Sequence, residues 1–507
     1  MQFEDVLPDL SRTSGRSVAK TARTLAARIV EYVVLIGGDV LVLMAGFLLG
    51  QWLAWSDTKH GLAAGWPFVN WLERNGLVDA GLFALVALIG INRFWARGHY
   101  TRRQPFWDEM RQIGEIAFKL ALIDFALLML LKADTSRFGM LCAWSLILAG
   151  IPSGRCVARS LLRTFSRWDR PTIIVGGGFN ALESGAALAA ERWMGLNVVA
   201  FVLPADEPID PTLKRELRGR QIPVLPLCDD PAKLLADWPR PVIVVALEIG
   251  GLNTHTRLIH SLQRLTPDLY IIPALRGLPL CGMDVGHFFS HEVLLLHVRN
   301  NLGRWGHRLI KRAFDIALSV CLLLTLSPLF GWLAWRVRKD GGPAVFAHER
   351  IGRGGHTFRC LKFRTMVPDA QARLQELLDR DPAALSEWER ERKLKNDPRI
   401  TAVGRLLRKT SLDELPQLWN VLRGDMSLVG PRPVIRDELK EYGDQLDYYL
   451  ESRPGITGLW QISGRSDTTY LTRVNLDAWY VRNWSLWYDL VILIRTVRVV
   501  LKGEGAY

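Results

Sequence analysis

Two adjacent carboxylates, Asp413 and Glu414, stand just ahead of Pro416 in the stretch TSLDELPQLWN, residues 410–420. Side chains of adjacent helical residues point about 100° apart, so one acid can attack a substrate while its neighbour holds a cation. A carboxylate that attacks a pyrophosphate gives an acyl-phosphate and splits one transfer into two easier steps. Oxygen ligands shared with substrate phosphates are what Mg²⁺ prefers. The acid pair therefore predicts phosphoryl transfer with Mg²⁺ as cofactor.

Arginine beside proline and glycine surrounds this pair. The motifs are KFRTM (362–366), NDPRIT (396–401), VGRLLRK (403–409), GDMSLVGPRP (424–433) and RPGITGLWQISGR (453–465). Guanidinium forks on rigid turns suit bidentate phosphate binding. We expect a helix N-terminus and these arginines to keep both acids ionised. A second interpretation is a capping box, in which Ser411 and Glu414 satisfy the first N–H groups of a helix and Pro416 lies in its first turn.

The composition suits a protein that is part membrane and part water-soluble. The 507 residues are 49% hydrophobic, include 19 tryptophans and carry a net charge of +13. A surface of this charge attracts nucleic acid, acidic lipid or phosphorylated substrates. The six cysteines are scattered without a CxxC pair, which argues against a disulfide framework or zinc site and for a reducing cytoplasm.

The elements that must position the acids begin with a membrane anchor. Residues 1–28 form a basic tail without a cleavable signal, and residues 29–165 are predicted to form a four-span transmembrane bundle. The apolar stretches are 29–55, 77–96, 113–132 and 139–158. Lys119 and Asp124 in the third stretch are expected to face the bundle interior. Arginine-rich loops place both ends of the bundle in the cytoplasm.

Residues 170–285 are predicted to form a Rossmann-like α/β domain. The stretch 170–202 is predicted to be strand, glycine turn, helix and strand, and apolar runs at 222–226, 241–248 and 269–275 continue the alternating α/β pattern. Gly176, Gly178 and Ala181 loosely match a dinucleotide-binding turn, but the acid expected about 20 residues later is missing. The alternatives are a working nucleotide site or a structural or regulatory domain that kept only the turn.

The catalytic segment, 305–507, begins with an apolar helix at 311–339 that is broken at Ser327 and Pro328. Basic residues flank both ends, with Lys311 and Arg312 expected at the membrane interface. A helix with both ends in the cytoplasm must be re-entrant; the alternative is an ordinary kinked transmembrane helix. The stretch 478–502 is either an interfacial amphipathic helix or a buried C-terminal helix.

Together, LKFRTM, NDPRIT, KTSLDELPQLWNVLRGDMSLVGPRP and RPGITGLWQISGR resemble the signature of the bacterial sugar transferase family, the monotopic phosphoglycosyl transferases. The layout is similar to its large members, the polyisoprenyl-phosphate hexose-1-phosphate transferases. The resemblance implies a mixed membrane and soluble fold: a four-helix transmembrane bundle, a Rossmann-like domain and a monotopic α-rich catalytic module with a re-entrant helix. It also implies a multi-pass protein of the bacterial inner membrane, with its N-terminus and catalytic domain cytoplasmic.

Members of this family move a sugar-1-phosphate from a UDP-hexose to undecaprenyl phosphate and release UMP, starting a cell-surface glycan. By similarity, Asp413 is the nucleophile and Glu414 binds Mg²⁺. The expected substrate- and phosphate-binding residues are Lys362, Arg364, Arg408, Arg432, Arg453 and Arg465. Galactose-1-phosphate is favoured over glucose-1-phosphate, and inner-membrane lipid and a second copy in a homodimer are expected partners.

Two rivals come from other classes. A membrane-bound nucleotide-sugar dehydratase or epimerase needs a complete dinucleotide fingerprint and usually a Tyr-x-x-x-Lys pair, which the sequence lacks. A non-catalytic scaffold of glycan assembly could use the same basic surface to hold lipid phosphates. No nucleic-acid partner is expected, because the basic residues lie in membrane-flanking loops and turns without a recognition helix.

Overall fold

The computed structural model divides the chain into two compact units, Met1–Leu275 and Arg276–Tyr507. It describes residues 10–57, 77–131, 136–204, 209–227, 238, 241–248, 250–266, 268–280, 283–287, 294–298, 301–339, 341–391, 394, 397–464 and 469–502. The first unit holds both the apolar helices and the parallel sheet, and the second holds the acid pair.

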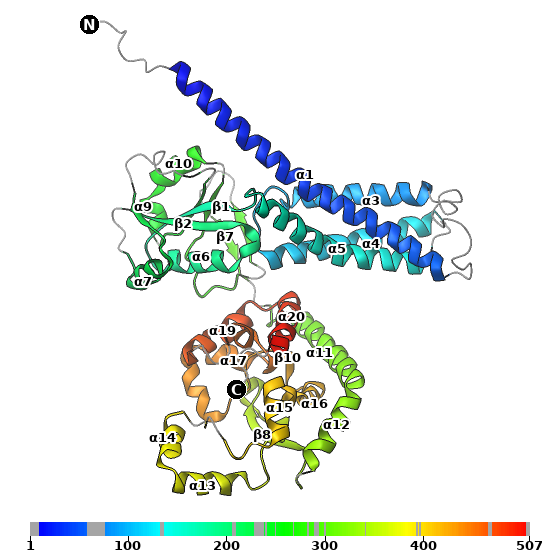
Figure 1. The fold of residues 1–507 in the computed structure, drawn as a ribbon, viewed down its shortest axis with the longest axis vertical. Helices are drawn as coiled ribbons and strands as arrows, with labels where there is room; N and C mark the ends of the chain where they lie inside the picture. The colour runs from blue at the N-terminus through cyan, green and yellow to red at the C-terminus, as the bar shows by residue number, and fades with distance from the viewer. Residues whose placement is uncertain are drawn as a thin grey trace. The chain divides into compact units, whose positions relative to one another are not determined.

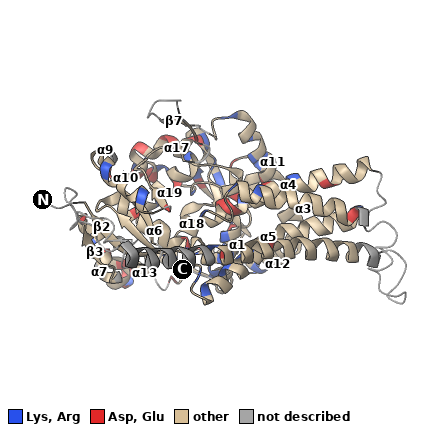
Figure 2. Ribbon diagram, turned by 90° about the horizontal axis from the view of Figure 1, so that it is seen from above, with Lys and Arg blue, Asp and Glu red and all other residues tan. Residues whose placement is uncertain are grey.

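Four long helices form the apolar part of the first unit (Figure 1): α1 (Leu10–Asp57), α3 (Leu77–Ala96), α4 (Phe106–Leu130) and α5 (Arg137–Thr164). Helix α1 packs along α5, and α4 contacts both α3 and α5. Charged residues are sparse along these helices (Figure 2). Among the described residues, three helical segments are long and apolar enough to cross a membrane, Ala27–Leu53, Asp79–Ala96 and Arg137–Thr164, and the bent pair Trp305–Thr325 and Ser327–Arg338 would be a fourth if it formed one span. The basic stretch before residue 28 is helical from Leu10.

Helix α4 does not meet the criterion for a span, because three charged residues, Glu115, Lys119 and Asp124, lie in its apolar stretch. Asp124 is buried and accepts a hydrogen bond from Trp144 Nε1 at 2.9 Å, as an inward-facing acid should. The same expectation is wrong for Lys119, which is exposed. The buried face at this turn is filled by Ile116, Ala117 and Leu120.

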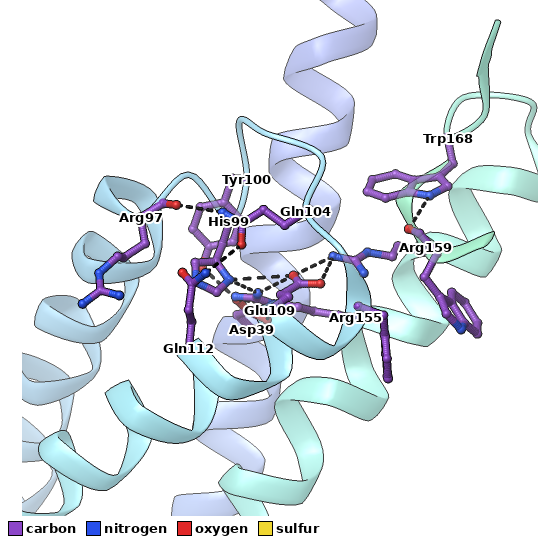
Figure 3. Close-up of polar contacts among 12 residues, drawn as sticks. Asp39, Arg97, His99, Tyr100, Gln104, Glu109, Gln112, Arg155, Arg159 and Trp168 are labelled. Atoms are coloured by element: carbon purple, nitrogen blue, oxygen red, sulfur yellow. Dashed lines mark hydrogen bonds and ion pairs between the residues drawn. The ribbon is translucent and has the colours of Figure 1, made fainter. Parts of the chain in front are cut away.

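A buried ion network joins the helices at one end of the bundle (Figure 3). Arg155 of α5 contacts Asp39 of α1 at 2.6 Å and Glu109 of α4 at 2.8 Å, and Arg159 contacts Glu109 at 2.6 Å. His99, in the turn after α3, meets Arg155 through Nδ1 at 2.8 Å. Because these side chains are almost wholly buried, each charge depends on its partner.

The same end of the bundle is tied to the sheet by a second set of ion pairs. Glu31 of α1 pairs with Arg103 at 3.2 Å and with Arg170 of β1 at 2.9 Å. Asp268 pairs with Arg170 at 2.9 Å and with Arg28 of α1 at 2.8 Å. Ion pairs therefore join helix α1 to the sheet of the first unit, in addition to the covalent connection along the chain.

The parallel sheet has the strand order β3-β2-β1-β4-β5. Its strands, β1 (Arg170–Val175), β2 (Leu196–Leu203), β3 (Val224–Pro226), β4 (Val242–Val245) and β5 (Leu269–Ile271), lie where the apolar runs predicted them. Helices α6 (Phe179–Ala190) and α7 (Pro211–Arg220) cover one face, and α10 (Thr256–Leu265) covers the other. The expected α/β architecture is confirmed. The short helices η2 (Arg192–Met194) and α9 (Gly251–Thr254) complete the region.

The second unit opens with the hairpin β6 (Asp284–His287) and β7 (Leu294–His297), followed by helices α11 (Trp305–Thr325) and α12 (Ser327–Arg338). These two helices meet at an angle of 65°. Pro328 lies in the first turn of α12, where a missing N–H costs least, and Ser327 Oγ donates to the carbonyl of Leu324 at 2.8 Å. The break thus falls at the Ser-Pro pair.

The remaining elements surround the acid pair. They are β8 (Val345–Ile351), η3 (Arg353–Gly355), β9 (Thr357–Phe363), α13 (Ala370–Arg380), α14 (Pro382–Glu391), α15 (Ala402–Thr410), η4 (Leu412–Glu414), α16 (Gln417–Arg423), β10 (Ser427–Val429), η5 (Arg436–Gln445), α17 (Leu446–Glu451), β11 (Gly455–Thr457), α18 (Leu459–Ile462), α19 (Tyr470–Arg482) and α20 (Leu486–Lys502). Strands β8 and β9 form an antiparallel hairpin, and β10 and β11 pair in parallel. The proline-glycine turns after β10 and before β11 meet so closely that a Cβ on Gly430 would overlap the carbonyl oxygen of Arg453.

Candidate active site

The acid pair lies on η4, a single turn between α15 and α16. Helix α15 ends at Ser411, whose φ of 55° is in the left-handed region and reverses the chain. The Ser411 side chain makes no capping hydrogen bond to the turn, and Glu414 pairs with a lysine instead. The capping-box interpretation is therefore wrong, and the two carboxylates are available for other partners.

Lys362 of β9 faces both acids. Its Nζ lies 2.7 Å from Glu414 Oε1 and 3.7 Å from Asp413 Oδ2. The two carboxylates raise the pKa of the Lys362 ammonium against the opposing effect of burial. A fixed cation between two acids, on a strand of a rigid hairpin, is suited to stabilise charge on a bound phosphate.

Burial raises the pKa of Asp413 above its ordinary value. Lys362 and Arg408 oppose this shift, whereas the neighbouring Glu414 adds to it. The expectation that a helix N-terminus and nearby arginines set the ionisation of Asp413 is therefore incomplete, because the effect of burial on its pKa outweighs that of the nearby cations. A desolvated carboxylate is a stronger nucleophile than a hydrated one once it is charged.

Arg408 belongs to this cluster. It lies on α15, its Nε donates to Thr365 Oγ1 at 3.0 Å, and its charge acts on Asp413. Burial lowers the pKa of its guanidinium, although Asp413 and Asp397 oppose that effect. Lys362, Arg408, Asp413 and Glu414 are thus brought together from three elements, as the sequence motifs predicted.

Arg364 does not fit the phosphate-binding role expected of it. Its guanidinium is buried and donates to the carbonyls of Pro343 (2.8 Å), Met366 (2.9 Å) and Val337 (2.9 Å). These bonds fix the turn after α12 against the end of β9. The correction has a simple physical reason: the donors that would bind phosphate are used by the backbone.

The side chains of Arg312 and Arg453 also donate hydrogen bonds to backbone carbonyls. Arg312 donates to the carbonyls of Val421 (2.5 Å) and Leu422 (2.8 Å), and Arg453 Nε donates to the carbonyl of Gly424 at 2.7 Å. All three carbonyls lie at the C-terminal end of α16, where unsatisfied acceptors attract cations. The acid pair precedes the opposite end of this helix, so these arginines position it from a distance.

Lys311, which was expected at the membrane interface, lies inside the protein among polar partners. The Lys311 ammonium is buried, 2.7 Å from Asp489 Oδ2, and donates to Tyr480 and to the carbonyl of Val429. Asp489 accepts further bonds from Tyr480 and Trp484. This network fastens α11 to α19, α20 and β10. Asp489 was missed, although an acid inside the apolar run WYDLV was a signal for a buried partner.

The two other predicted basic residues differ in position. The backbone N–H of Arg432 donates to Asp477 at 3.4 Å, and its guanidinium lies over the Trp460 ring, 5.5 Å from the centroid. Arg465 lies outside the described residues.

The donor set fits Mg²⁺. No group of three or more His, Cys, Asp or Glu side chains that could hold a metal occurs among the described residues. Asp413 and Glu414 are two adjacent carboxylates. Mg²⁺ is usually bound in this way, through one or two carboxylates together with substrate phosphates and water.

The glycine turn of the α/β domain is covered by a carboxylate of the same chain, that of Glu248. Glu248 Oε1 accepts the backbone N–H of Asn180 at 2.7 Å, in the first turn of α6. A Cβ on Gly178 would lie 2.6 Å from the same oxygen, so the carboxylate covers the turn. This is the place where a Rossmann turn binds pyrophosphate. The geometry favours the interpretation that the domain kept the turn without its ligand.

Comparison with known proteins adds four findings. Residues 306–503 match the family described as bacterial sugar transferase. The chain is 44% identical over 428 residues to the undecaprenyl-phosphate galactose phosphotransferase of Salmonella typhimurium, covering 83% of this chain and 87% of the relative. It is 43% identical over 431 residues to the UDP-galactose-lipid carrier transferase of Erwinia amylovora, with the same coverage. The exopolysaccharide production protein ExoY of Sinorhizobium fredii is 54% identical over 198 residues, covering 39% of this chain and 88% of the relative.

Proposed function

Because the chain belongs to the bacterial sugar transferase family, we propose that it transfers a hexose-1-phosphate from a UDP-sugar to undecaprenyl phosphate and releases UMP. The relatives identify the chain as an enzyme of phosphoglycosyl transfer. The observation that carries the proposal is the acid pair on η4 with Lys362 2.7 Å from Glu414 and 3.7 Å from Asp413. The relatives at 44% and 43% identity carry galactose in their names, whereas a relative named as a glucose phosphotransferase is 31% identical over 78% of the chain, which favours galactose-1-phosphate.

The proposed chemistry has two steps. An oxygen of ionised Asp413 attacks the sugar-bearing phosphorus of the donor, the bond from that phosphorus to the bridging oxygen breaks, and UMP leaves with the electron pair. A phosphate oxygen of undecaprenyl phosphate then attacks the same phosphorus and frees the Asp413 carboxylate. Lys362 and Arg408 lie beside Asp413, where they would stabilise negative charge on the transferred group.

Mg²⁺ would be held by Glu414 and the donor phosphates, and it would neutralise charge on the leaving pyrophosphate oxygen. Lys362 now neutralises Glu414, so in the complex its ammonium would be shared with a phosphate. The adjacent position of the two acids keeps these roles separate.

The bent helix pair α11–α12 supports a membrane-seated acceptor site. Large apolar side chains of the pair are exposed: Leu309, Ile310, Ile316, Val320, Leu324, Trp332 and Trp335. Lys339 and Arg336 lie over Trp335 and Trp332, at 3.9 and 5.8 Å from the ring centroids, an arrangement typical of a membrane interface. We propose that the pair is re-entrant, that the four helices of the first unit form a multi-pass anchor in the inner membrane, and that the catalytic unit is cytoplasmic.

The rivals receive less support. A dehydratase or epimerase needs a dinucleotide, yet the carboxylate of Glu248 lies over the glycine turn of the α/β domain, where its pyrophosphate would bind. A scaffold needs no acid pair held against a lysine. We further propose that the reaction is the first membrane step of a cell-surface glycan and that the enzyme acts as a homodimer.

The direct test is sugar transfer by the purified protein in nanodiscs with undecaprenyl phosphate and Mg²⁺. We expect UDP-galactose to yield UMP and a lipid-linked product, and UDP-glucose to react more slowly. Transfer of neither hexose, with the lipid acceptor and Mg²⁺ present, would contradict the proposal. Faster transfer from UDP-glucose would overturn only the choice of sugar.

A further inference from the structure

Three arginines from three elements converge in the second unit: Arg350 of β8, Arg432 in the turn after β10, and Arg473 of α19. Arg432 and Arg473 both lie over the ring of Trp460, at 5.5 and 4.4 Å from its centroid. Burial lowers the pKa of Arg350 and of Arg473, and in both the next largest cause is the charge of Arg432. We refer to Arg350, Arg432 and Arg473 as the arginine cluster.

The cluster carries more positive charge than its acidic neighbours neutralise. Glu438 lies 4.0 Å from Arg350 and accepts the backbone N–H of Ile435, and among the described residues neither Arg432 nor Arg473 has an ion pair. Asp477 is buried, accepts the hydroxyl of Tyr442 at 3.0 Å, and burial raises its pKa to about 7. At neutral pH this carboxyl therefore supplies only part of a negative charge.

Hydrogen-bond donors also remain unused in the cluster. Arg473 Nε and Trp460 Nε1 are buried and have no partner among the described residues. Asp477 Oδ1 is likewise buried without a hydrogen-bond partner among the described residues. Buried donors are nearly always paired in folded proteins, so Arg473 Nε and Trp460 Nε1 mark a place where a further acceptor can bind. An anionic ligand would offset the positive charge of the cluster and would supply the missing hydrogen-bond acceptor.

Arg350 of the arginine cluster lies on the same face of the β8–β9 hairpin as Lys362, which contacts the acid pair. Cross-strand pairs Phe346 with Lys362, His348 with Cys360 and Arg350 with Phe358 alternate along the hairpin and so share one face. Cys360 lies between Lys362 and Arg350 on this face. Burial raises the pKa of its thiol, and the charges of Lys362, Glu414 and Arg350 also act on it. Arg350 is thus two same-face positions from Lys362, about 14 Å along the hairpin.

The two ends of this hairpin face pack against different parts of the second unit. At the lysine end, Phe363 packs with Leu333 and Val337 of α12, one of the two bent helices. At the other end, Ile351 packs with Tyr449 and Val474 in a cluster without any residue of α11 or α12 among its described members. Of the two phosphate-bearing substrates, the soluble nucleotide fits the cluster end and the lipid fits the other.

We propose that Arg350, Arg432 and Arg473 form the subsite for the nucleoside monophosphate half of the donor, the half that leaves as UMP. The proposal rests on the proposed function and deepens it. The transferred phosphate lies at Asp413 and Lys362, the second phosphate is joined to it through one bridging oxygen, and the long side chains of the cluster reach along the hairpin face toward this second phosphate. Arg473 binds it with N–H donors that the protein leaves unused, and Trp460 holds the Arg432 and Arg473 planes in place.

The test compares UMP binding by calorimetry with steady-state kinetics, using full-length protein in nanodiscs. In Arg473→Ala, lost charge-assisted hydrogen bonds should weaken UMP binding and raise the KM for the UDP-sugar roughly 10- to 100-fold, with the KM for undecaprenyl phosphate unchanged. Arg350→Gln, on a different element, should weaken UMP binding in the same direction, and it keeps the test informative if Arg473→Ala folds poorly. Arg380→Ala is the control, because Arg380 of α13 is exposed and pairs only with Glu376 four residues away.

Unchanged UMP affinity in folded Arg473→Ala and Arg350→Gln would overturn the subsite while leaving the transferase reaction intact. A raised KM for the lipid acceptor alone would assign the cluster to the lipid phosphate and overturn it as well. Wild-type protein that binds UMP, with the affinity reduced in both variants, but transfers no sugar would support the subsite and contradict the proposed function.

Discussion

At the scale of single residues, the site places the half-buried carboxylate of Asp413 beside two cations, Lys362 and Arg408. Burial raises the pKa of Asp413, and Glu414 next to it has the same effect. A carboxylate held in this way is costly to the fold in its charged form, as is common for reactive groups. Such a position agrees with the proposed role of Asp413 as the nucleophile.

We predict that Asp413→Asn leaves the protein as stable as the wild type or more so. Because the folded-state pKa of Asp413 is raised, the folded state holds its proton more tightly than the unfolded chain does. Stability is then lost as pH rises from the unfolded pKa through the raised folded pKa, and removing the charge removes this penalty at neutral pH. Melting temperatures at pH 7.5 test this prediction. A fall of several degrees in Asp413→Asn would show that the carboxylate stabilises the fold.

The same shift sets the pH dependence of activity. Attack needs ionised Asp413, so kcat/KM should fall as pH drops through its raised pKa, above the usual range near 4 for an aspartate. Lys362→Met removes the cation that opposes the shift. We expect this variant to lose about 10²- to 10³-fold in kcat/KM and to move the acidic limb to higher pH.

The control for this profile is Lys409→Met, since Lys409 is exposed on α15. Its profile should match that of the wild type. If Lys362→Met keeps the wild-type limb, Lys362 does not control the ionisation of Asp413.

At the scale of elements, the sequence predicted where helices and strands lie along the chain, but it did not predict which side chains contact one another. The five strands of the parallel sheet and the break at Ser327-Pro328 follow from local patterns: short apolar runs between turns, and a proline inside a helix. The partners of Lys311 and Arg364 could not be read in this way. Asp489 lies 178 residues from Lys311 in the chain, and only the folded packing brings the two together.

The bent pair α11–α12 makes a prediction about topology. In a background without the six native cysteines, Gly306→Cys and Arg338→Cys mark its two ends. A Cβ at Gly306 meets no atom within 4 Å, and Arg338 is exposed, so both changes should be tolerated. If the pair is re-entrant, a membrane-impermeant maleimide should label both sites in inverted inner-membrane vesicles and neither in spheroplasts. Labelling of one site in each preparation would show a spanning helix.

At the scale of the whole molecule, buried charge joins parts of the first unit that sequence patterns treat as separate. Asp39, Glu109 and Arg155 link three helices, and Glu31 and Asp268 link α1 to the sheet. Composition and periodicity predicted a bundle and an α/β domain, yet they gave no sign of these long-range pairs. The exopolysaccharide production protein ExoY of Sinorhizobium fredii matches 39% of this chain, although the match covers 88% of its own length.

We predict that Arg155→Met destabilises the first unit by about 3–5 kcal/mol, because it leaves two buried carboxylates without their shared cation. Thermal unfolding in detergent should show a clearly lower melting temperature. Arg137→Met is the matched control, since Arg137 begins the same helix and is exposed. Equal melting of the two variants would mean that the network contributes little.

The central claim is that Asp413 carries the sugar phosphate. The measurement that tests it most directly is incubation of the protein with UDP-galactose labelled with ³²P at the sugar phosphate, without acceptor, followed by a denaturing gel. The account predicts label on the wild-type protein that undecaprenyl phosphate removes, and neither label nor turnover in Asp413→Asn. Full turnover by Asp413→Asn, or wild-type turnover without any trapped label, would contradict the claim.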